Sequence, residues 1–324
     1  MRPNKIILIS LGILALAGIA VYAGIGPVIR SLVELKASGL AIITLIHLPV
    51  IALLGLAWWC IGRGAGLWAF TAARLGRDAV SEILPLSQLG GFLAGARLLT
   101  RAGVNAANAA FSLFADLIAE FSAKLIYTLL GLVVLARLLP ESTLLRPFSI
   151  ALALIIAVLL VTVFLYGRFK PGLQRLAARA VQRLAGAQNS GGADDVFAAN
   201  RLLPSLGLHL ICWLFGAFEA WITLRLMGTP VSGSQAFVID SLATAFRSLG
   251  FLMPASLGVQ ETGYVLVSAL FGLSPATAVA FSLTRRARDM LIGLTGLFIW
   301  QRMEWRSPDA DVSKASARYS LHSK

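Results

Sequence analysis

ATAVAFSLTRRARDMLIGLTGLFIW, residues 276–300, decides the fold of this chain, because three arginines and an aspartate lie in the middle of an apolar segment. A charged side chain at the centre of a bilayer costs about 2.5–3.5 kcal/mol. The cluster therefore requires buried partners, water or an anionic ligand. At 3.6 residues per turn, Arg285, Arg288 and Asp289 share one helix face, whereas Arg286 points elsewhere. One face of this helix is predicted to be a charged surface packed among other helices.

The composition predicts an all-α, polytopic integral membrane protein. Of its 324 residues, 58% are hydrophobic and 13% charged, and the mean hydropathy is +0.81, well above what a soluble core requires. Six apolar runs are long enough to cross a hydrocarbon layer of about 30 Å. They cover residues 6–23, 40–61, 106–136, 148–166, 202–224 and 277–300. The fold predicted is a helical bundle with about six full spans.

Two further segments, 83–99 and 236–271, contain proline, glycine and charged residues and are predicted to be re-entrant. If both return to the side they left, 18 of the 28 Lys and Arg residues are cytoplasmic, Arg74 and Arg77 among them, and five lie on the opposite side. This bias predicts a bacterial inner-membrane protein with both termini in the cytoplasm. The first apolar run has the features of a signal peptide, but its length favours an uncleaved anchor.

The chain is predicted to form a single membrane domain over residues 1–306, followed by a disordered cytoplasmic tail, 307–324. A basic amphipathic linker, 168–201, on the cytoplasmic face divides the domain into halves 1–167 and 202–306. Each half contains an interrupted helix, LPLSQLGG at 84–91 and MPASLGVQE at 253–261. These segments predict an inverted repeat with breaks near the midplane. The residues assigned to the breaks are Pro85, Gly90, Gly91, Pro254 and Gly258.

A polar stripe runs along the helix predicted after residue 105, with residues spaced three or four apart. It consists of Asn105, Asn108, Ser112, Asp116, Glu120 and Lys124. Lys124 is expected to neutralise Glu120, which leaves Asp116 in need of a cation from Arg247, Arg285 or Arg288. Two interpretations are open. Buried ion pairs could lock the helices together, or the stripe could line a water-filled cavity, which the six polar residues favour.

The second half carries a matching set, with Asp240, Thr244 and Arg247 on one helix face. A helix break is expected at Pro254, because proline removes a backbone donor. Glu261 follows this break. Glu261 is open to two interpretations: a cap at a helix N-terminus, or a partner of an arginine in the 285–289 cluster beside an anion site.

No catalytic, metal or cofactor motif is found in the sequence. Two cysteines, Cys60 and Cys212, lie in apolar runs, and His47, His209 and His322 lack ligand spacing, so these residues are expected to be packing groups without an acid beside a histidine. No cofactor is expected. The net charge of +13 and pI near 10.7 are explained by topology and by anionic lipid. Nucleic-acid binding would need a soluble basic domain, and none is predicted.

PASLGVQE at 254–261, followed by RRARD at 285–289, resembles the P-G-G-x-G-x-x-E then R signature of the lysylphosphatidylglycerol synthase transmembrane, or flippase-like, family. The segments 84–91 and 260–264 look most like its hopanoid-biosynthesis-associated HpnL group. The resemblance covers about residues 5–305. It implies an inner-membrane protein that moves lipid between leaflets and lacks an aminoacyl-transferring domain. The implied motif positions are Pro254, Gly258, Glu261 and Arg285, whereas Ala255-Ser256 departs from the usual Gly-Gly.

These observations favour a lipid flippase or transporter for a hopanoid or related polar-headed lipid, with arginines that bind an anionic or hydroxylated head group. Its partners would be membrane lipids and other membrane proteins of the hopanoid pathway. The cavity residues expected are Asn108, Asp116, Glu120, Lys124, Asp240, Arg247, Glu261, Arg285, Arg288 and Asp289. Two alternatives are open: a membrane enzyme or accessory partner in hopanoid biosynthesis without transport activity, and helices held together by ion pairs alone.

Overall fold

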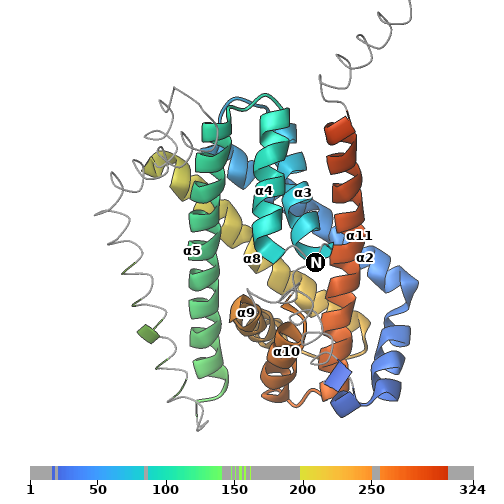
Figure 1. The fold of residues 1–324 in the computed structure, drawn as a ribbon. Helices are drawn as coiled ribbons and strands as arrows, with labels where there is room; N and C mark the ends of the chain where they lie inside the picture. Colours follow the sequence, from blue (N-terminus) through green and yellow to red (C-terminus); the bar gives the residue numbers. More distant parts are fainter. Residues whose placement is uncertain are drawn as a thin grey trace, which may run out of the picture.

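The computed structural model describes residues 21–83, 87–140, 198–249 and 256–305, with isolated positions at 17–18 and between 147 and 161. Helices account for the regular structure of these ranges, with no strand among them, as the composition predicted (Figure 1). The tail and all but the last four residues of the predicted linker 168–201 lie outside the described residues, and α8 begins within those four. The helices are α2 (Ile25–Ile61), α3 (Leu67–Ile83), α4 (Ser87–Arg101), α5 (Ala106–Leu138), α8 (Ala199–Leu226), α9 (Gly233–Leu249), α10 (Val259–Ala269) and α11 (Pro275–Trp305).

Helices α2, α5 and α8 are long and apolar enough to cross a membrane. They contain the predicted spans 40–61, 106–136 and 202–224. Helix α2 begins at Ile25 and bends at Lys36, where φ is 57°. The predicted span 277–300 lies within the 31 residues of α11, which carries the arginine cluster in its middle. Spans 6–23 and 148–166 fall mostly outside the described residues, so the structure supports a membrane protein without fixing six spans.

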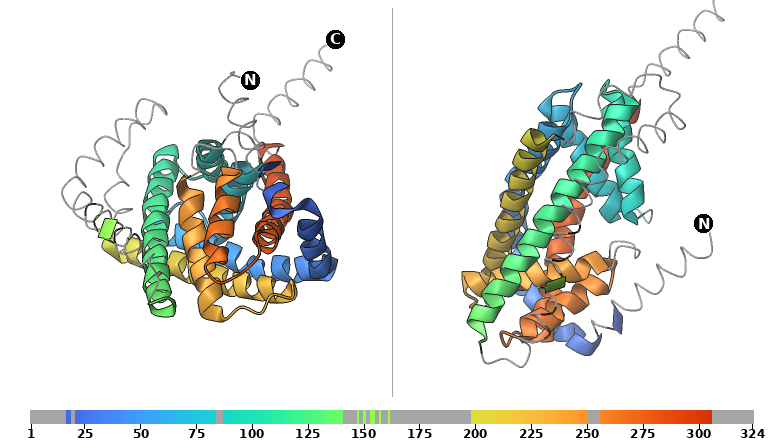
Figure 2. Two further views of the ribbon diagram at one scale, coloured as in Figure 1. Left: turned by 90° about the horizontal axis from the view of Figure 1, so that it is seen from below. Right: turned by 90° about the vertical axis from the view of Figure 1, so that its left-hand side faces the viewer.

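Two helical hairpins lie between the long helices. Helices α3 and α4 have 17 and 15 residues, and α9 and α10 have 17 and 11. Each is shorter than the roughly 20 residues that a membrane crossing needs. The α3–α4 hairpin occupies one end of the molecule and the α9–α10 hairpin the other, while α5 extends along both (Figures 1 and 2). The first hairpin begins at Leu67 rather than at residue 83, so it also takes Arg74 and Arg77 into the bundle.

The glycines of the two hairpins have different roles. Gly258 adopts φ 81° at the start of α10, which forms the expected break. Gly90 and Gly91 were predicted as part of a break, but both lie inside α4, so that prediction is wrong. A helical glycine without a side chain permits close packing, and Gly91 lies against α3. Pro85 and Pro254 fall in the interruptions between helices, outside the described residues.

Replacing Gly91 with alanine is expected to destabilise the first hairpin by about 1–3 kcal/mol, the range for overpacking. The added Cβ would lie 2.5 Å from the carbonyl oxygen of Arg77 and closer still to Ser81 Oγ. The hydroxyl can rotate away, whereas the backbone carbonyl cannot. The measurement is thermal unfolding in detergent micelles. The control is Gly207→Ala in α8, where a Cβ meets nothing within 4 Å and stability should hold or rise.

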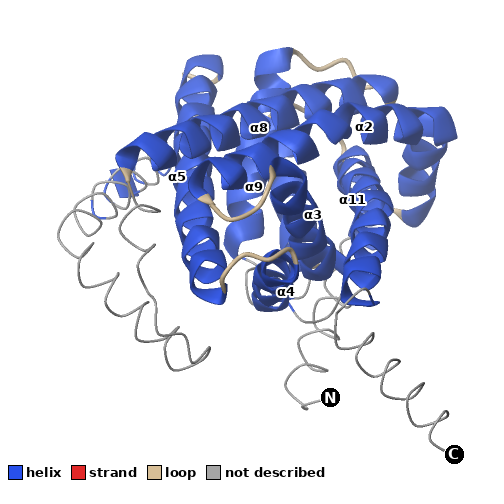
Figure 3. Cartoon of the chain, turned by 90° about the horizontal axis from the view of Figure 1, so that it is seen from above, coloured by secondary structure: helices blue, strands red, loops and turns tan. Residues whose placement is uncertain are grey.

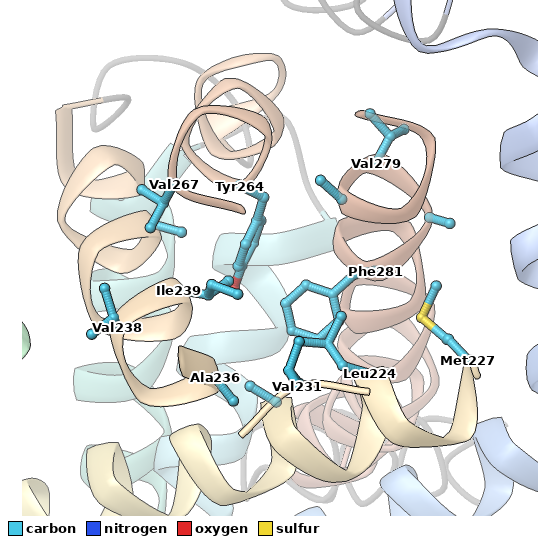
Figure 4. Close-up of a cluster of buried hydrophobic side chains, with 14 of the residues drawn as sticks. Leu224, Met227, Val231, Ala236, Val238, Ile239, Tyr264, Val267, Val279 and Phe281 are labelled. Atoms are coloured by element: carbon cyan, nitrogen blue, oxygen red, sulfur yellow. The ribbon is translucent and has the colours of Figure 1, made fainter. Parts of the chain in front are cut away.

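The apolar core is divided between the two hairpins. One cluster packs α9, α10 and α11 against α8, with Tyr264 facing Phe281 edge-on at a centroid distance of 5.0 Å (Figure 4). The other large cluster gathers around Trp58 and Phe70, where α3 and α4 meet α2 and α5, and a smaller third cluster packs α2 against α5 around Ile61 and Phe111. Helices α2 and α8 lie against each other along one side, and α3 lies beside α11 (Figure 3). Charged side chains fill the region between the two large clusters.

The outer surface of the long helices is apolar. Large exposed side chains include Leu45 on α2, Phe114 and Leu130 on α5, Leu214 on α8 and Leu294 on α11. Only 22–33% of the most apolar windows of α2, α5 and α8 is buried. Contiguous apolar surface of this kind marks contact with lipid or another apolar partner. The bundle is therefore apolar outside and charged at its centre, as expected of a membrane protein.

Candidate functional site: a charged central cavity

A cavity of about 490 Å³ lies at the centre of the described helices. All eight helices α2, α3, α4, α5, α8, α9, α10 and α11 contribute to its wall. Apolar side chains such as Leu54, Leu117 and Ile292 alternate with charged ones. The charged residues of the wall are Arg74, Arg77, Asp78, Glu82, Glu120, Lys124, Arg247, Arg285, Arg288 and Asp289. This size is typical of a site for a small molecule or a head group.

Two arginines of α3 bind the acidic stripe of α5. Arg74 donates to Asp116 at 3.3 Å and to Glu120 at 2.8 and 3.1 Å. Arg77 donates to the same two carboxylates at 3.2 and 2.6 Å. Asp116 is fully buried behind the cavity wall, while Glu120 keeps 18% of its side chain exposed and lines the cavity. These two arginines and two carboxylates thus form one compact network, in which the attraction between opposite charges offsets the cost of burying each of them.

The arginine cluster of α11 binds acids on three other elements. Arg285 donates to Asp240 of α9, which also accepts from Tyr127 at 2.7 Å. Arg288 donates to Glu219 of α8 at 2.5 Å and to the neighbouring Asp289 at 2.7 Å. Glu219 is a fully buried acid on the apolar span 202–224. The face predicted to be charged is therefore a row of ion pairs.

Arg286 turns to another side of α11 and binds Glu261 of α10. Its Nε lies 2.6 Å from Glu261 Oε1, and both side chains are buried. Glu261 also accepts from the Gly258 N–H at 2.8 Å and from Ser282 Oγ at 3.0 Å. Glu261 caps α10 and also pairs with an arginine of the cluster, so the cap and the pairing occur together, while the anion site stays a prediction. That arginine is Arg286, which was predicted to point away from the helix face shared by Arg285, Arg288 and Asp289.

Arg247 links the two hairpins. It lies on α9, donates to Glu82 of α3, and approaches Asp289 of α11 at 4.0 Å. Glu82 and Arg247 keep 22% and 29% of their side chains exposed. Partly solvated pairs are worth less than buried ones, because water competes for each group. Among the charged contacts described, this bridge is the one most easily broken.

Two histidines correct the expectation that these residues are packing groups. His209 Nε2 lies 2.9 Å from Asp116 Oδ1 with both side chains fully buried. His47 Nδ1 lies 2.9 and 3.0 Å from the two carboxylate oxygens of Glu219. Both histidines line the cavity. Each is therefore an acid-paired histidine, contrary to the prediction from spacing, because the pairs join residues 93 and 172 positions apart.

Other expected pairings are wrong. Glu120 binds Arg74 and Arg77 rather than Lys124, whose amine lies 5.1 Å from the centroid of the Trp213 ring. Asp116 is bound by Arg74 and Arg77 of α3 and by His209 of α8, not by Arg247, Arg285 or Arg288. A signal for Arg74 was present in its i, i+4 spacing to Asp78. Arg74 and Arg77 had been placed in a cytoplasmic loop, so that signal went unused.

The ten residues expected to form the cavity divide into three groups. Six line it: Glu120, Lys124, Arg247, Arg285, Arg288 and Asp289. Asp116 and Asp240 bind lining arginines from behind, and Glu261 holds Arg286 on another side of α11. Asn108 lies outside the cavity, because α5 enters its wall only from Leu117 onward. Across the described ranges, no three His, Cys, Asp or Glu side chains converge as metal ligands would.

The profile of the lysylphosphatidylglycerol synthase TM region matches residues 7–296 of the chain. The chain belongs to this family. Neither the curated proteins nor the solved structures give a significant match. Of the family motif positions, Gly258, Glu261 and Arg285 all lie at the boundary between the second hairpin and α11, although Glu261 pairs with Arg286 and Arg285 with Asp240. Membership in the lysylphosphatidylglycerol synthase TM region family identifies a membrane protein whose relatives act on lipids.

Proposed function

We propose that the chain is a lipid flippase or transporter that carries the polar head of an amphiphilic lipid through the central cavity. The observation that carries the proposal is a charged cavity inside a bundle whose long helices are apolar outside. A polar head in the hydrocarbon layer would lose its hydrogen bonds to water. A wall of arginines and carboxylates replaces them, while the apolar body of the lipid stays beside the outer face of the helices.

The two hairpins supply the expected moving parts. We propose that they form an inverted repeat and that each end opens in turn, since transporters with discontinuous helices bind their cargo where the repeats meet. The Glu82–Arg247 contact between α3 and α9 would close the cavity in one state. In this proposal the chain has about six spans and lies in the bacterial inner membrane with both termini in the cytoplasm. The cargo would be a hopanoid or related polar-headed lipid, with membrane proteins of that pathway as partners.

The test is lipid movement in reconstituted vesicles, measured by the accessibility of a fluorescent lipid to a quencher added outside. Arg288→Ala is expected to slow the movement at least about ten-fold, because it frees the buried carboxylate of Glu219 at the cavity wall. The matched control is Arg302→Ala, an exposed arginine on the same helix, which should move lipid normally. Normal movement by a folded Arg288→Ala protein would exclude the cluster from transport.

A non-transporting role in hopanoid biosynthesis predicts a different phenotype. An enzyme or accessory partner would leave a deletion strain with altered lipid structures, whereas a transporter would leave normal lipids in the wrong leaflet. We propose the second outcome, without enzymatic activity of the chain. Lipid mass spectrometry of whole cells, combined with labelling of outer-leaflet lipid, separates the two. Altered structures with a normal leaflet distribution would contradict transport.

A further inference from the structure

The cavity wall is not a free cationic surface, and this limits which head groups it can bind. Each of its five arginines already binds at least one carboxylate: Arg74 and Arg77 bind Asp116 and Glu120, Arg247 binds Glu82, Arg285 binds Asp240, and Arg288 binds Glu219. Together with Lys124 the wall has six cations. The carboxylates that line it or bind its arginines number seven, namely Asp78, Glu82, Asp116, Glu120, Glu219, Asp240 and Asp289. An anionic head would have to compete with these carboxylates for each arginine.

Within the described ranges, two buried polar atoms on the cavity wall have no hydrogen-bond partner. They are His209 Nδ1 and Gln260 Oε1, and both residues line the cavity. His209 is fully buried and Gln260 is 2% exposed. A buried polar atom without a hydrogen bond costs about 1–3 kcal/mol, so such atoms in native proteins call for an explanation. A ligand in the cavity would supply one.

Neighbouring hydrogen bonds fix both atoms as acceptors. Glu261 can only accept, so the single proton of Ser282 Oγ points to Glu261. Ser282 Oγ must then accept from Gln260 Nε2 at 3.2 Å, which leaves Gln260 Oε1 as the free end of the amide. Asp116 can only accept, so the proton of a neutral His209 ring is placed on Nε2, and Nδ1 is then the acceptor of that ring. Both atoms need a donor.

Lys124 is the complementary group. Its ammonium lines the cavity, lies over the Trp213 ring, and forms no ion pair within the described part of the chain. The wall thus offers a ligand two buried acceptors and one cationic donor, beside uncharged hydroxyl and indole groups such as those of Tyr264 and Trp213. An ammonium head would satisfy the acceptors but meet Lys124 as a like charge. An anionic head would pair with Lys124 but present lone pairs to the acceptors.

We infer that the cavity binds an uncharged, polyhydroxylated head group. A hydroxyl both donates and accepts, so a head with several hydroxyls can donate to His209 Nδ1 and Gln260 Oε1 and accept from Lys124. This inference rests on the proposed function, for which it names the class of cargo.

The experiment measures how much lipid the full-length protein retains in native mass spectrometry, after incubation with three diacyl lipids of identical chains. Their heads are a glucosyl group, a primary ammonium and a phosphate monoester. The glucosyl lipid is expected to be retained at least about five-fold more than either charged lipid, which corresponds to one or two hydrogen bonds. Preference for the phosphate or the ammonium lipid, or no retention of the glucosyl lipid, would overturn the inference.

Variants locate the binding to the wall. Gln260→Leu and His209→Leu are each expected to reduce retention of the glucosyl lipid about five-fold and to leave the phosphate lipid unchanged. The control is Ser268→Ala, which removes another buried unpartnered oxygen from the same helix as Gln260 but away from the cavity. Gln260→Leu keeps the test valid if His209→Leu fails to fold, because the described partner of the Gln260 side chain is the neutral hydroxyl of Ser282. Unchanged glucosyl retention by Gln260→Leu would contradict the inference.

Vesicle transport separates this inference from the proposed function. A protein that moves lipid but prefers the phosphate head would leave the flippase proposal standing and reject the hydroxylated cargo. A protein that retains the glucosyl lipid specifically and moves none of the three would support the binding site and reject transport.

Discussion

Replacing Glu261 with leucine is expected to lower the free energy of unfolding by about 3–5 kcal/mol, the cost of breaking a buried ion pair from one side. The substitution removes a carboxylate that accepts from the Gly258 N–H, Ser282 Oγ and Arg286. Hydrogen bonds between membrane helices contribute about 0.6–2 kcal/mol. The larger part of the lost stability is therefore expected to come from the guanidinium of Arg286. This residue is 7% exposed and would no longer be bound by the Glu261 carboxylate.

Thermal unfolding of the purified protein in detergent micelles measures the effect. The control is Glu34→Leu, an exposed acid on α2, for which a change within about 0.5 kcal/mol is expected. The double variant Glu261→Leu with Arg286→Leu should regain most of the loss, since replacing both partners of a buried pair by apolar groups is often neutral. A double variant as unstable as Glu261→Leu would show that capping of α10 outweighs the charge.

Helical spacing predicted which side chains point inward, because that information is local. The stripe with Asp116, Glu120 and Lys124, the set Asp240 and Arg247, and the cluster Arg285, Arg288 and Asp289 all follow from steps of three or four residues. The break at Gly258 also follows from local sequence, because the turn adopts a positive φ that glycine accommodates.

Spacing could not predict which inward side chains meet. The partners of Asp116 lie on α3 and α8, 42 and 93 positions away, and that pairing depends on how the hairpin inserts. Arg74 and Arg77 were predicted to be cytoplasmic because the first hairpin was predicted to begin at residue 83, after both arginines. The helix of residues 67–83 is amphipathic and of low mean apolarity, so a search for apolar spans passes over it.

Glu219 and His47 were missed for a related reason. Glu219 is the single acid in the span 202–224 and His47 the single histidine in the span 40–61, and such isolated residues give no periodic pattern. Membrane thermodynamics supplies the missing signal, since an ionisable residue inside a span is expensive and is expected to have a partner. Applied to residues 202–224, that rule would have selected Glu219 beside the arginine cluster, to which it is bound through Arg288.

Replacing Asp116 with leucine is the second substitution with a large expected effect, again about 3–5 kcal/mol of unfolding free energy. Asp116 is fully buried and binds Arg74 at 3.3 Å, Arg77 at 3.2 Å and His209 at 2.9 Å. Its loss leaves two neighbouring arginines to share Glu120 and Asp78, and leaves His209 Nε2 without an acceptor. The position that Asp116 would vacate is fully buried behind the cavity wall, so the parts of these groups that face it have little access to water.

Glu120→Leu provides the comparison that identifies burial as the cause. Glu120 binds the same two arginines at shorter distances, 2.6 and 2.8 Å, but keeps 18% of its side chain exposed to the cavity. Water in the cavity can solvate the arginines that Glu120 releases, so its loss is expected to cost less than half as much as that of Asp116. Contact distance alone would predict the opposite order. If unfolding in micelles shows Glu120→Leu to be the less stable protein, then direct pairing rather than burial controls the stability of this network, and the cavity is drier than a path for a polar head group requires.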